Sequence, residues 1–188
     1  MSVPKAPKPC KLVFGLLFRR NDEKVHVLSE LTDMFGPLDA VTKSQEFTYT
    51  RYYEKEMGSG ILRLFGSFVE PVDPERLAEI KGRTNLLEQE WARDGRRTVN
   101  VDPGLLSEDS LILATGKKAG HRIYLRDGIY ADLHLLYQDG AYRPLPWTYP
   151  DYAQEDTRRF FGLLRGTLMA HRLGRLPRSF PTLKEISL

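Results

Sequence analysis

The chain has 188 residues, of which 41% are hydrophobic and 28% charged, with a formal net charge of +3. This balance excludes a disordered chain and is typical of a folded domain, while a charge of +3 does not favour nucleic acid as a partner. No stretch approaches the roughly 18 apolar residues that cross a bilayer. Cys10 is the only cysteine, which excludes an internal disulfide. We therefore expect a cytoplasmic protein without a membrane partner.

The first third of the chain predicts strands on either side of a helix. An almost continuously apolar run, 11–18, is typical of a central strand buried on both faces. A helix is predicted from Asn21 or Asp22 to Gly36, because a capping residue precedes apolar residues at helical spacing. Two further strands are predicted over residues 46–53 and 61–72.

A second helix has the clearest signals. Asp73 and Pro74 are typical of a first turn, and one apolar face is formed by Leu77, Ile80, Thr84, Leu87 and Trp91. Short strands are predicted over residues 98–101 and 111–115, with a turn at residues 102–104.

The second half predicts a meander followed by a helix. The dipeptides Asp127-Gly128 and Asp139-Gly140 favour hairpin turns between strands at residues 121–126, 129–137 and 141–145. The helix begins near Asp151, with Gln154 three residues later as in a capping box.

The order of elements predicts an α+β fold. Its opening part matches a ferredoxin-like β-α-β-β-α-β core, which an antiparallel three-strand meander and a C-terminal helix extend. We expect one domain over residues 11–173, a flexible N-terminus over 1–10 and an irregular basic tail over 174–188.

Common catalytic motifs are missing from the sequence. Gly116-Lys117 is followed by Lys118 instead of Ser or Thr, so a phosphate-binding P-loop is excluded. The first strand is not followed by the Gly-x-Gly-x-x-Gly of dinucleotide-binding folds. There is also no Gly-x-Ser-x-Gly or His-Glu-x-x-His motif. These absences leave open a site whose residues converge from distant strands.

One candidate cluster follows from hairpin geometry. If Asp127-Gly128 is a two-residue turn, His121 lies opposite His134, and Asp132 shares their face. Two imidazoles and a carboxylate suit a divalent metal or acid-base chemistry. A one-residue bulge would break this register, and paired surface histidines are the simpler interpretation.

Other candidate residues lie in the connections. Asn100 and Asp102 flank a proline-containing turn, where polar groups at a strand end can bind a ligand or simply form the turn. Lys117 lies in a glycine-flanked loop that suits an anion. Trp147 and Tyr149 belong to an aromatic segment, 146–152, which either packs over the sheet or forms an apolar wall for a flat ligand.

The last helix carries a basic stripe. Seven basic residues and no acidic ones occur between Thr157 and Lys184. Arg158, Arg165 and Arg172 recur every seven residues and so share one helix face. The stripe can meet phosphate or an acidic partner, or it is a solvated face.

Five ordered segments resemble a known family. They are Lys11-Leu12-Val13-Phe14-Gly15-Leu16-Leu17, Tyr52-Tyr53-Glu54-Lys55-Glu56-Met57-Gly58, Asn100-Val101-Asp102-Pro103-Gly104, His121-Arg122-Ile123-Tyr124-Leu125 and Trp147-Thr148-Tyr149-Pro150-Asp151-Tyr152. Over about residues 5 to 170 the chain is similar to the bacterial domain-of-unknown-function family 4416. Members are sometimes labelled GTP-binding, but the resemblance implies no defined activity or catalytic residues.

The resemblance also favours some of the candidate site residues over others. In the family pattern, the positions of Asp132 and His134 more often read as Glu and Thr, which disfavours the metal hypothesis. His121, Arg122 and Tyr124 remain as the stronger part of the hairpin.

We therefore expect a protein that binds a nucleotide or another small phosphorylated compound, with or without catalysis. Arg122 and Lys117 would hold anionic oxygens, His121 would act as acid-base group, and Asp102 would orient it or hold a divalent ion. Asn100, Tyr124, Trp147 and Tyr149 complete the expected ligand site. The alternative is a non-catalytic module that binds RNA or a protein through the basic helix.

Overall fold

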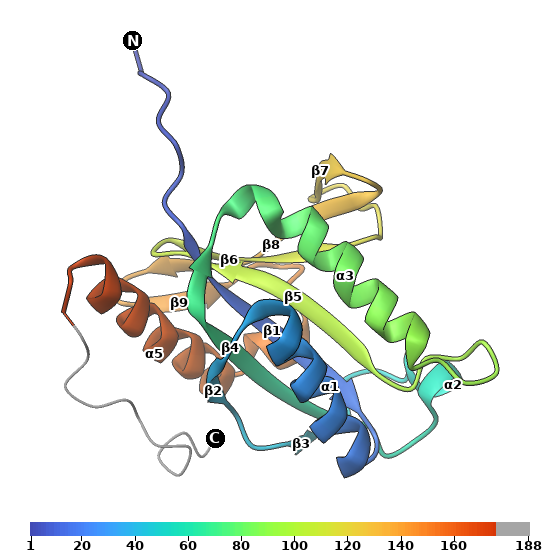
Figure 1. Cartoon of the computed structure of the whole chain (residues 1–188). Coiled ribbons are helices and arrows are strands. Elements are labelled where there is room, and N and C mark those ends of the chain that lie inside the picture. The colour runs from blue at the N-terminus through green and yellow to red at the C-terminus, as the bar shows by residue number, and fades with distance from the viewer. Residues whose placement is uncertain (176–188) are drawn as a thin grey trace.

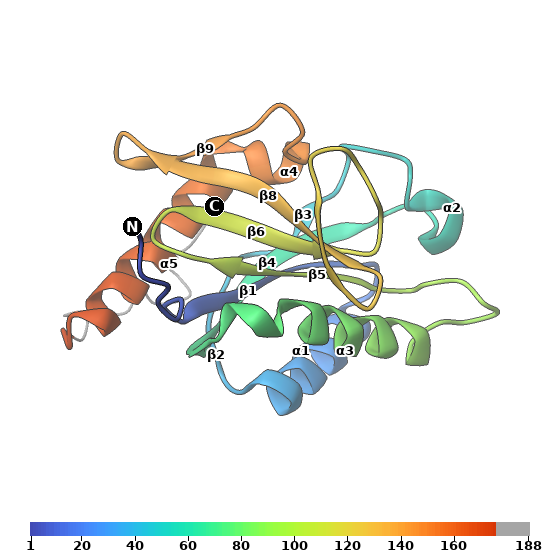
Figure 2. The ribbon, with the colours of Figure 1, turned by 90° about the horizontal axis from the view of Figure 1, so that it is seen from above.

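The computed structural model describes residues 1–175, which form a nine-stranded antiparallel sheet with helices on both faces (Figures 1 and 2). The strands follow the order β2-β4-β1-β5-β6-β8-β7, while β3 pairs with β4 and β9 pairs with β8. The strands are β1 (Cys10–Phe18), β2 (Leu38–Val41), β3 (Gln45–Glu46), β4 (Leu62–Val72), β5 (Asn100–Leu106), β6 (Ser110–Thr115), β7 (Ile123–Arg126), β8 (Ile129–Gln138) and β9 (Ala141–Pro144). The helices are α1 (Asn21–Phe35), α2 (Glu54–Met57), the 3₁₀ turn Pro74–Arg76, α3 (Leu77–Glu90), α4 (Pro150–Ala153) and α5 (Glu155–Arg172).

The first part of the chain forms the predicted ferredoxin-like core. Its elements run β1-α1-β2-β4-α3-β5, and the strands lie side by side as β2-β4-β1-β5, each antiparallel to its neighbour. Helices α1 and α3 cover one face of this core (Figure 2). The α+β prediction with a C-terminal helix is confirmed.

Strand β1 lies at the centre of the sheet, and all nine of its residues are buried. Phe14 packs in the cluster formed with α1 and α3, while Val13 packs with Phe160 and Phe161 of α5 on the other face. Side chains alternate between the faces of a strand, so a strand between two helical layers needs apolar residues at every position. The continuous apolar run in the sequence has this origin.

The predicted strand over residues 46–53 is wrong. Only Glu46 belongs to a strand, and the chain continues irregularly into the short helix α2. Phe47 and Tyr53 pack against a small cluster of Leu17, Met57 and Ile61. The aromatic spacing therefore reflects this separate cluster and not the two-residue repeat of a strand.

The predicted turn at residues 102–104 is also wrong, because these residues lie inside β5. Asp102 pairs with Gly15 of β1 and Pro103 with Phe14, whereas pairing with β6 begins only at Gly104, opposite Leu113. Proline lacks the N–H that a strand with two neighbours needs, so it is tolerated where only one neighbour is present. The side of β5 at Asp102 is thereby left open.

Two hairpins form the extension of the sheet. Asp127 and Asp139 have φ angles of 53° and 50°, each followed by a glycine with positive φ, as the Asp-Gly signals predicted. Because β6 pairs along most of β8, both β7 and β9 lie on its other edge. The gap between them is filled by the next connection, where Trp147 Nε1 donates to Leu133 O (2.8 Å) and Thr148 Oγ1 donates to His134 O.

The register of the first hairpin differs from the prediction. Arg126 pairs with Ile129 as expected, but Tyr124 pairs with Tyr130 and Ile123 with Ala131, which places a bulge beside Leu125. His121 lies before β7 and is not opposite His134 in a strand pair. Residues 116–122, which precede β7, form a loop.

The last predicted helix is two helices. Backbone angles of −59° and 144° at Gln154 separate α4 from α5, and Gln154 Nε2 donates to Pro150 O (3.0 Å), so the expected capping box is absent. Among residues 1–175 there is no helix long and apolar enough to cross a membrane. From residue 176 the expected basic tail lies outside the described residues.

Candidate functional site

A cavity of about 170 Å³ lies where β5 begins and β6 ends. Three residues of the expected site line it: Asp102 on β5, which was expected to orient His121 or hold a divalent ion, and the expected ligand-binding residues Lys117 after β6 and Tyr149 before α4. Aromatic residues from the irregular segment after β3 form much of the remaining wall. The full lining is Leu17, Phe47, Tyr49, Thr50, Tyr52, Tyr53, Arg63, Asp102, Lys117, Tyr149, Pro150 and Asp151.

All five segments that carry the family resemblance meet at this cavity. Four of them line it directly, through Leu17, Tyr52 and Tyr53, Asp102, and Tyr149 to Asp151. The fifth, residues 121–125, lies behind it, since Arg122 Nη2 donates to Tyr149 Oη (3.0 Å). Segments separated by up to about 130 residues therefore surround one space.

Arg63 of β4 forms the floor of the cavity. Its Nη1 donates to Asp102 Oδ2 (3.2 Å), and its Nη2 lies 2.7 Å from Asp151 Oδ2. The guanidinium also lies 4.9 Å from the ring centroid of Phe65 and 5.1 Å from that of Tyr152. Two carboxylates and these rings stabilise a cation whose side chain is 5% exposed. Burial by itself lowers the pKa of Arg63, but its neighbours, Asp151 first and then Tyr152 and Asp102, raise this pKa above its usual value.

Asp102 is ionised beside this arginine. Burial is the largest influence and by itself raises the pKa of Asp102, but the charges of Arg63 and Lys81, together with hydrogen bonds to the carboxylate, hold the pKa below its usual value. Asp102 thus faces the cavity as a carboxylate at neutral pH.

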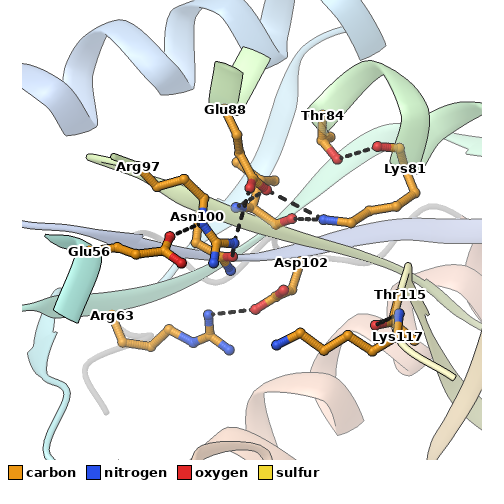
Figure 3. A network of polar contacts seen from close by, with 11 residues as sticks. Glu56, Arg63, Lys81, Thr84, Glu88, Arg97, Asn100, Asp102, Thr115 and Lys117 are labelled. Carbon is orange, nitrogen blue, oxygen red and sulfur yellow. Dashed lines mark hydrogen bonds and ion pairs between the residues drawn. The ribbon is translucent and has the colours of Figure 1, made fainter. Parts of the chain in front are cut away.

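A polar network on α3 holds the start of β5 in place (Figure 3). Lys81 Nζ donates to Val101 O (2.8 Å), and Glu88 Oε1 accepts from Val101 N (3.0 Å). Arg97 Nη1 donates to Asn100 Oδ1 (2.9 Å) and lies 3.5 Å from Glu88 Oε2. Burial raises the pKa of Glu88. Asn100 therefore lies next to the cavity, inside the network, and does not line it.

Lys117 and Tyr52 meet at the mouth of the cavity. Lys117 Nζ donates to Tyr52 Oη (2.9 Å) and lies 4.0 Å from the centroid of the ring. This hydrogen bond is the main cause of a lowered pKa for Tyr52. Figure 3 shows the amine of Lys117 directed toward the region of Asp102 and Arg63. The lysine is exposed, so it can exchange Tyr52 for an anionic oxygen of a ligand.

Arg122 is fully engaged within the protein. Its Nε donates to Asp132 Oδ2 (2.8 Å), its Nη1 to Lys117 O (2.8 Å) and its Nη2 to Tyr149 Oη (3.0 Å). A guanidinium held by three partners fixes the backbone of Lys117 and the ring of Tyr149 on two sides of the cavity. This geometry supports a positioning role.

His121, Asp132 and His134 do come together, although not through the expected register. Asp132 Oδ1 lies 3.3 Å from His134 Nδ1 and 3.5 Å from His121 Nε2, but neither contact has hydrogen-bond geometry. Within residues 1–175, no group of three or more His, Cys, Asp or Glu side chains is arranged to hold a metal ion. The geometry therefore gives the metal hypothesis no support.

Three further expected residues lie outside the cavity. His121 stacks on Trp147 with ring centroids 4.7 Å apart, and Trp147 packs over the edge of β8. Tyr124 is 58% exposed on β7 and contacts the ring of Tyr130. Trp147 thus packs on the sheet, whereas Tyr149 of the same segment forms a cavity wall.

Sequence reasoning missed two charged residues of the cavity. Arg63 lies in the mostly apolar first part of β4, residues 62–66, and a charge within such a run is the signal that could have identified it. The position of Asp151 at the start of the predicted helix is typical of a helix cap. Its side chain is 5% exposed, and its partner Arg63 is distant in sequence.

The arginines of the basic stripe are also engaged. Arg158 donates to Ala153 O and Tyr142 O, and Arg165 donates to Glu108 O. Arg172 pairs with Glu108 Oε2 (2.9 Å) and donates to Pro9 O. These contacts hold α5 against the sheet and leave fewer donors for an outside partner.

Comparison with known proteins places the chain in a family without a known activity. No curated protein and no solved structure matches it. A family model matches residues 8–167, which include all five segments and the whole cavity lining. The chain therefore belongs to the family described as Domain of unknown function (DUF4416).

Proposed function

We propose that this protein binds a nucleotide or a related small phosphorylated compound in the cavity. One observation carries the proposal: four of the five separate segments line one space and the fifth is hydrogen-bonded to its wall, with Asp102, Lys117 and Tyr149 at the lining. Aromatic walls accept a flat ring, and an exposed lysine at the mouth accepts an anion.

The size of the cavity indicates that it encloses only the ring of such a ligand and not its phosphate groups. A dry cavity of about 150 Å³ holds a benzene ring, while pockets that enclose a drug-sized ligand have about 300–1,000 Å³. A volume of about 170 Å³ accommodates one ring system. The phosphate groups would therefore remain at the mouth, where Lys117 is exposed.

Binding, and not a reaction, is the function proposed. His121 stacks on Trp147 behind the cavity, so no histidine lies at its lining among the described residues. The alternative of an RNA- or protein-binding helix has less support, because Arg158, Arg165 and Arg172 already bind within the chain.

A thermal-shift screen tests the proposal, with GTP, ATP, ribose 5-phosphate and adenine, each with and without magnesium. We expect stabilisation by the nucleotides that weakens as salt rises, since an exposed ammonium–phosphate contact is screened. Lys117→Ala should reduce it, and Lys118→Ala, an exposed neighbour outside the lining, should not. No shift with any compound at millimolar concentration would contradict the proposal.

A further inference from the structure

The floor of the cavity carries more negative than positive charge. Arg63 is the only cation there among the described residues, and it lies between two carboxylates, Asp102 (3.2 Å) and Asp151 (2.7 Å). Lys81, behind Asp102, pairs with Glu88 (3.4 Å), and Lys117 is at the exposed mouth. The floor is therefore lined by two carboxylates that share one guanidinium.

Asp151 provides a second, independent observation. Its Oδ2 atom is buried and lies 2.7 Å from Arg63 Nη2 in an ion pair that lacks hydrogen-bond geometry, so this pair leaves acceptor positions of the carboxylate unused. A carboxylate at the lining of the cavity favours an N–H donor over a carbonyl oxygen, because two facing acceptors repel. The surrounding rings of Phe47, Tyr53 and Tyr149 also attract positively polarised N–H groups.

We infer that the buried end of the ligand is a flat heterocycle whose edge carries an amino group, donated to Asp151 and Asp102. The inference rests on the proposed function and adds the chemical class of the ring to it. The two ends of such a ligand differ in polarity, with N–H donors facing the carboxylates of the floor and an anion facing Lys117 at the mouth.

Matched ligands test the inference by isothermal titration calorimetry on the full chain. Adenosine and inosine 5′-monophosphates differ chiefly in an amino group replaced by a carbonyl, and cytidine and uridine 5′-monophosphates differ in the same way. We expect the amino member to bind about tenfold tighter in at least one pair, the effect of one hydrogen bond to a charged group. Equal binding within both pairs would overturn the inference and leave the proposed function standing. Absence of binding by all four would overturn the inference, and the thermal-shift screen then decides whether the proposed function stands.

Asp151→Asn gives a sharper version of the test. The amide keeps the shape of the carboxyl group but can donate to a carbonyl oxygen, so the preference for the amino member should disappear or invert. Asp156→Asn, on an exposed position of α5, is the matched control and should keep the preference. If Asp151→Asn fails to fold, Asp102→Asn and the unaltered chain decide the question. A preference unchanged in a folded Asp151→Asn protein would contradict the assignment of this carboxylate.

Discussion

Gly15 lies directly against the guanidinium of Arg63. A Cβ atom at Gly15 would be 2.8 Å from Arg63 Cζ and 2.6 Å from Tyr152 Oη. The glycine has no positive φ angle, so its backbone conformation does not require glycine. What requires it is the space above the central strand, which the floor of the cavity occupies.

Gly15→Ala should therefore destabilise the protein by about 1–3 kcal/mol, the usual cost of overpacking a rigid interior. It should also weaken any ligand of the cavity, because Arg63 and Tyr152 must move. Urea unfolding measures the first effect. Gly162→Ala, in α5 with open space around it, is the matched control and should stabilise by about 0.5–1 kcal/mol. Equal effects of the two changes would contradict this account.

Replacement of Arg63 should have a larger effect on stability. Arg63→Met leaves the buried carboxylate of Asp151 and the partly buried one of Asp102 without their shared cation, and removal of one partner from a buried ion pair costs about 3–5 kcal/mol. Chemical denaturation measures the loss. Arg76→Met removes an exposed pair with Glu79, each side chain over 40% exposed, and should cost no more than about 1 kcal/mol.

The stability of the protein should fall in acid partly because of Asp102. The pKa of this carboxyl group is lower in the folded chain than its usual value. The folded state thus binds the proton less tightly than the unfolded state, and the stabilisation is present above the unfolded pKa of about 4 and lost as pH falls through the folded pKa. Asp102→Asn should make the decline between about pH 5 and 3 shallower, at about 1.4 kcal/mol for each unit of pKa shift. Unfolding midpoints measured across this pH range test the prediction. The control Asp156→Asn should keep the same slope of stability against pH as the unaltered chain.

The contact at the cavity mouth predicts a spectroscopic change. Lys117 lowers the pKa of Tyr52, so Lys117→Met should raise it toward the ordinary tyrosine value of about 10. Subtracting the ultraviolet titration of a Tyr52→Phe protein isolates this phenol from the other tyrosines. Lys118→Met should leave the pKa of Tyr52 unchanged. If Lys118→Met raised this pKa as much as Lys117→Met does, the cause would be the loss of a nearby positive charge and not the loss of the hydrogen bond.

The order of helices and strands could be predicted from the sequence more accurately than the structure of the segments that connect them. The helix ends, the buried central strand and the Asp-Gly turns depend on local chemistry, and each appears near its expected place. Residues 47–53 and 102–104 were misassigned because their structure depends on distant partners. Pro103 is typical of a turn in the sequence, but in the fold it pairs with β1 inside a strand. The proline is tolerated there because β6 does not pair with β5 at this position.

The same distinction applies to the cavity. Asp102, Lys117 and Tyr149 could be selected as polar or aromatic residues in exposed-looking connections. Arg63 could not be assigned a role, since its meaning depends on Asp102 and Asp151, which lie 39 and 88 residues further along the chain. Likewise, the hydrogen bonds that engage Arg122 arise only once the loop before β7 folds back on β8.

The two sides of the cavity are attached to the sheet in different ways. The side with Tyr149 follows a connection that hydrogen-bonds to the edge of β8 in place of a strand. On the other side, among the described residues, the backbone hydrogen bonds of residues 48–56 stay within 48–58. Substitutions and insertions that change which ligand shapes fit the cavity should accordingly accumulate in residues 48–51, where the sheet need not be rebuilt, while the wall at Tyr149 changes only together with the framework.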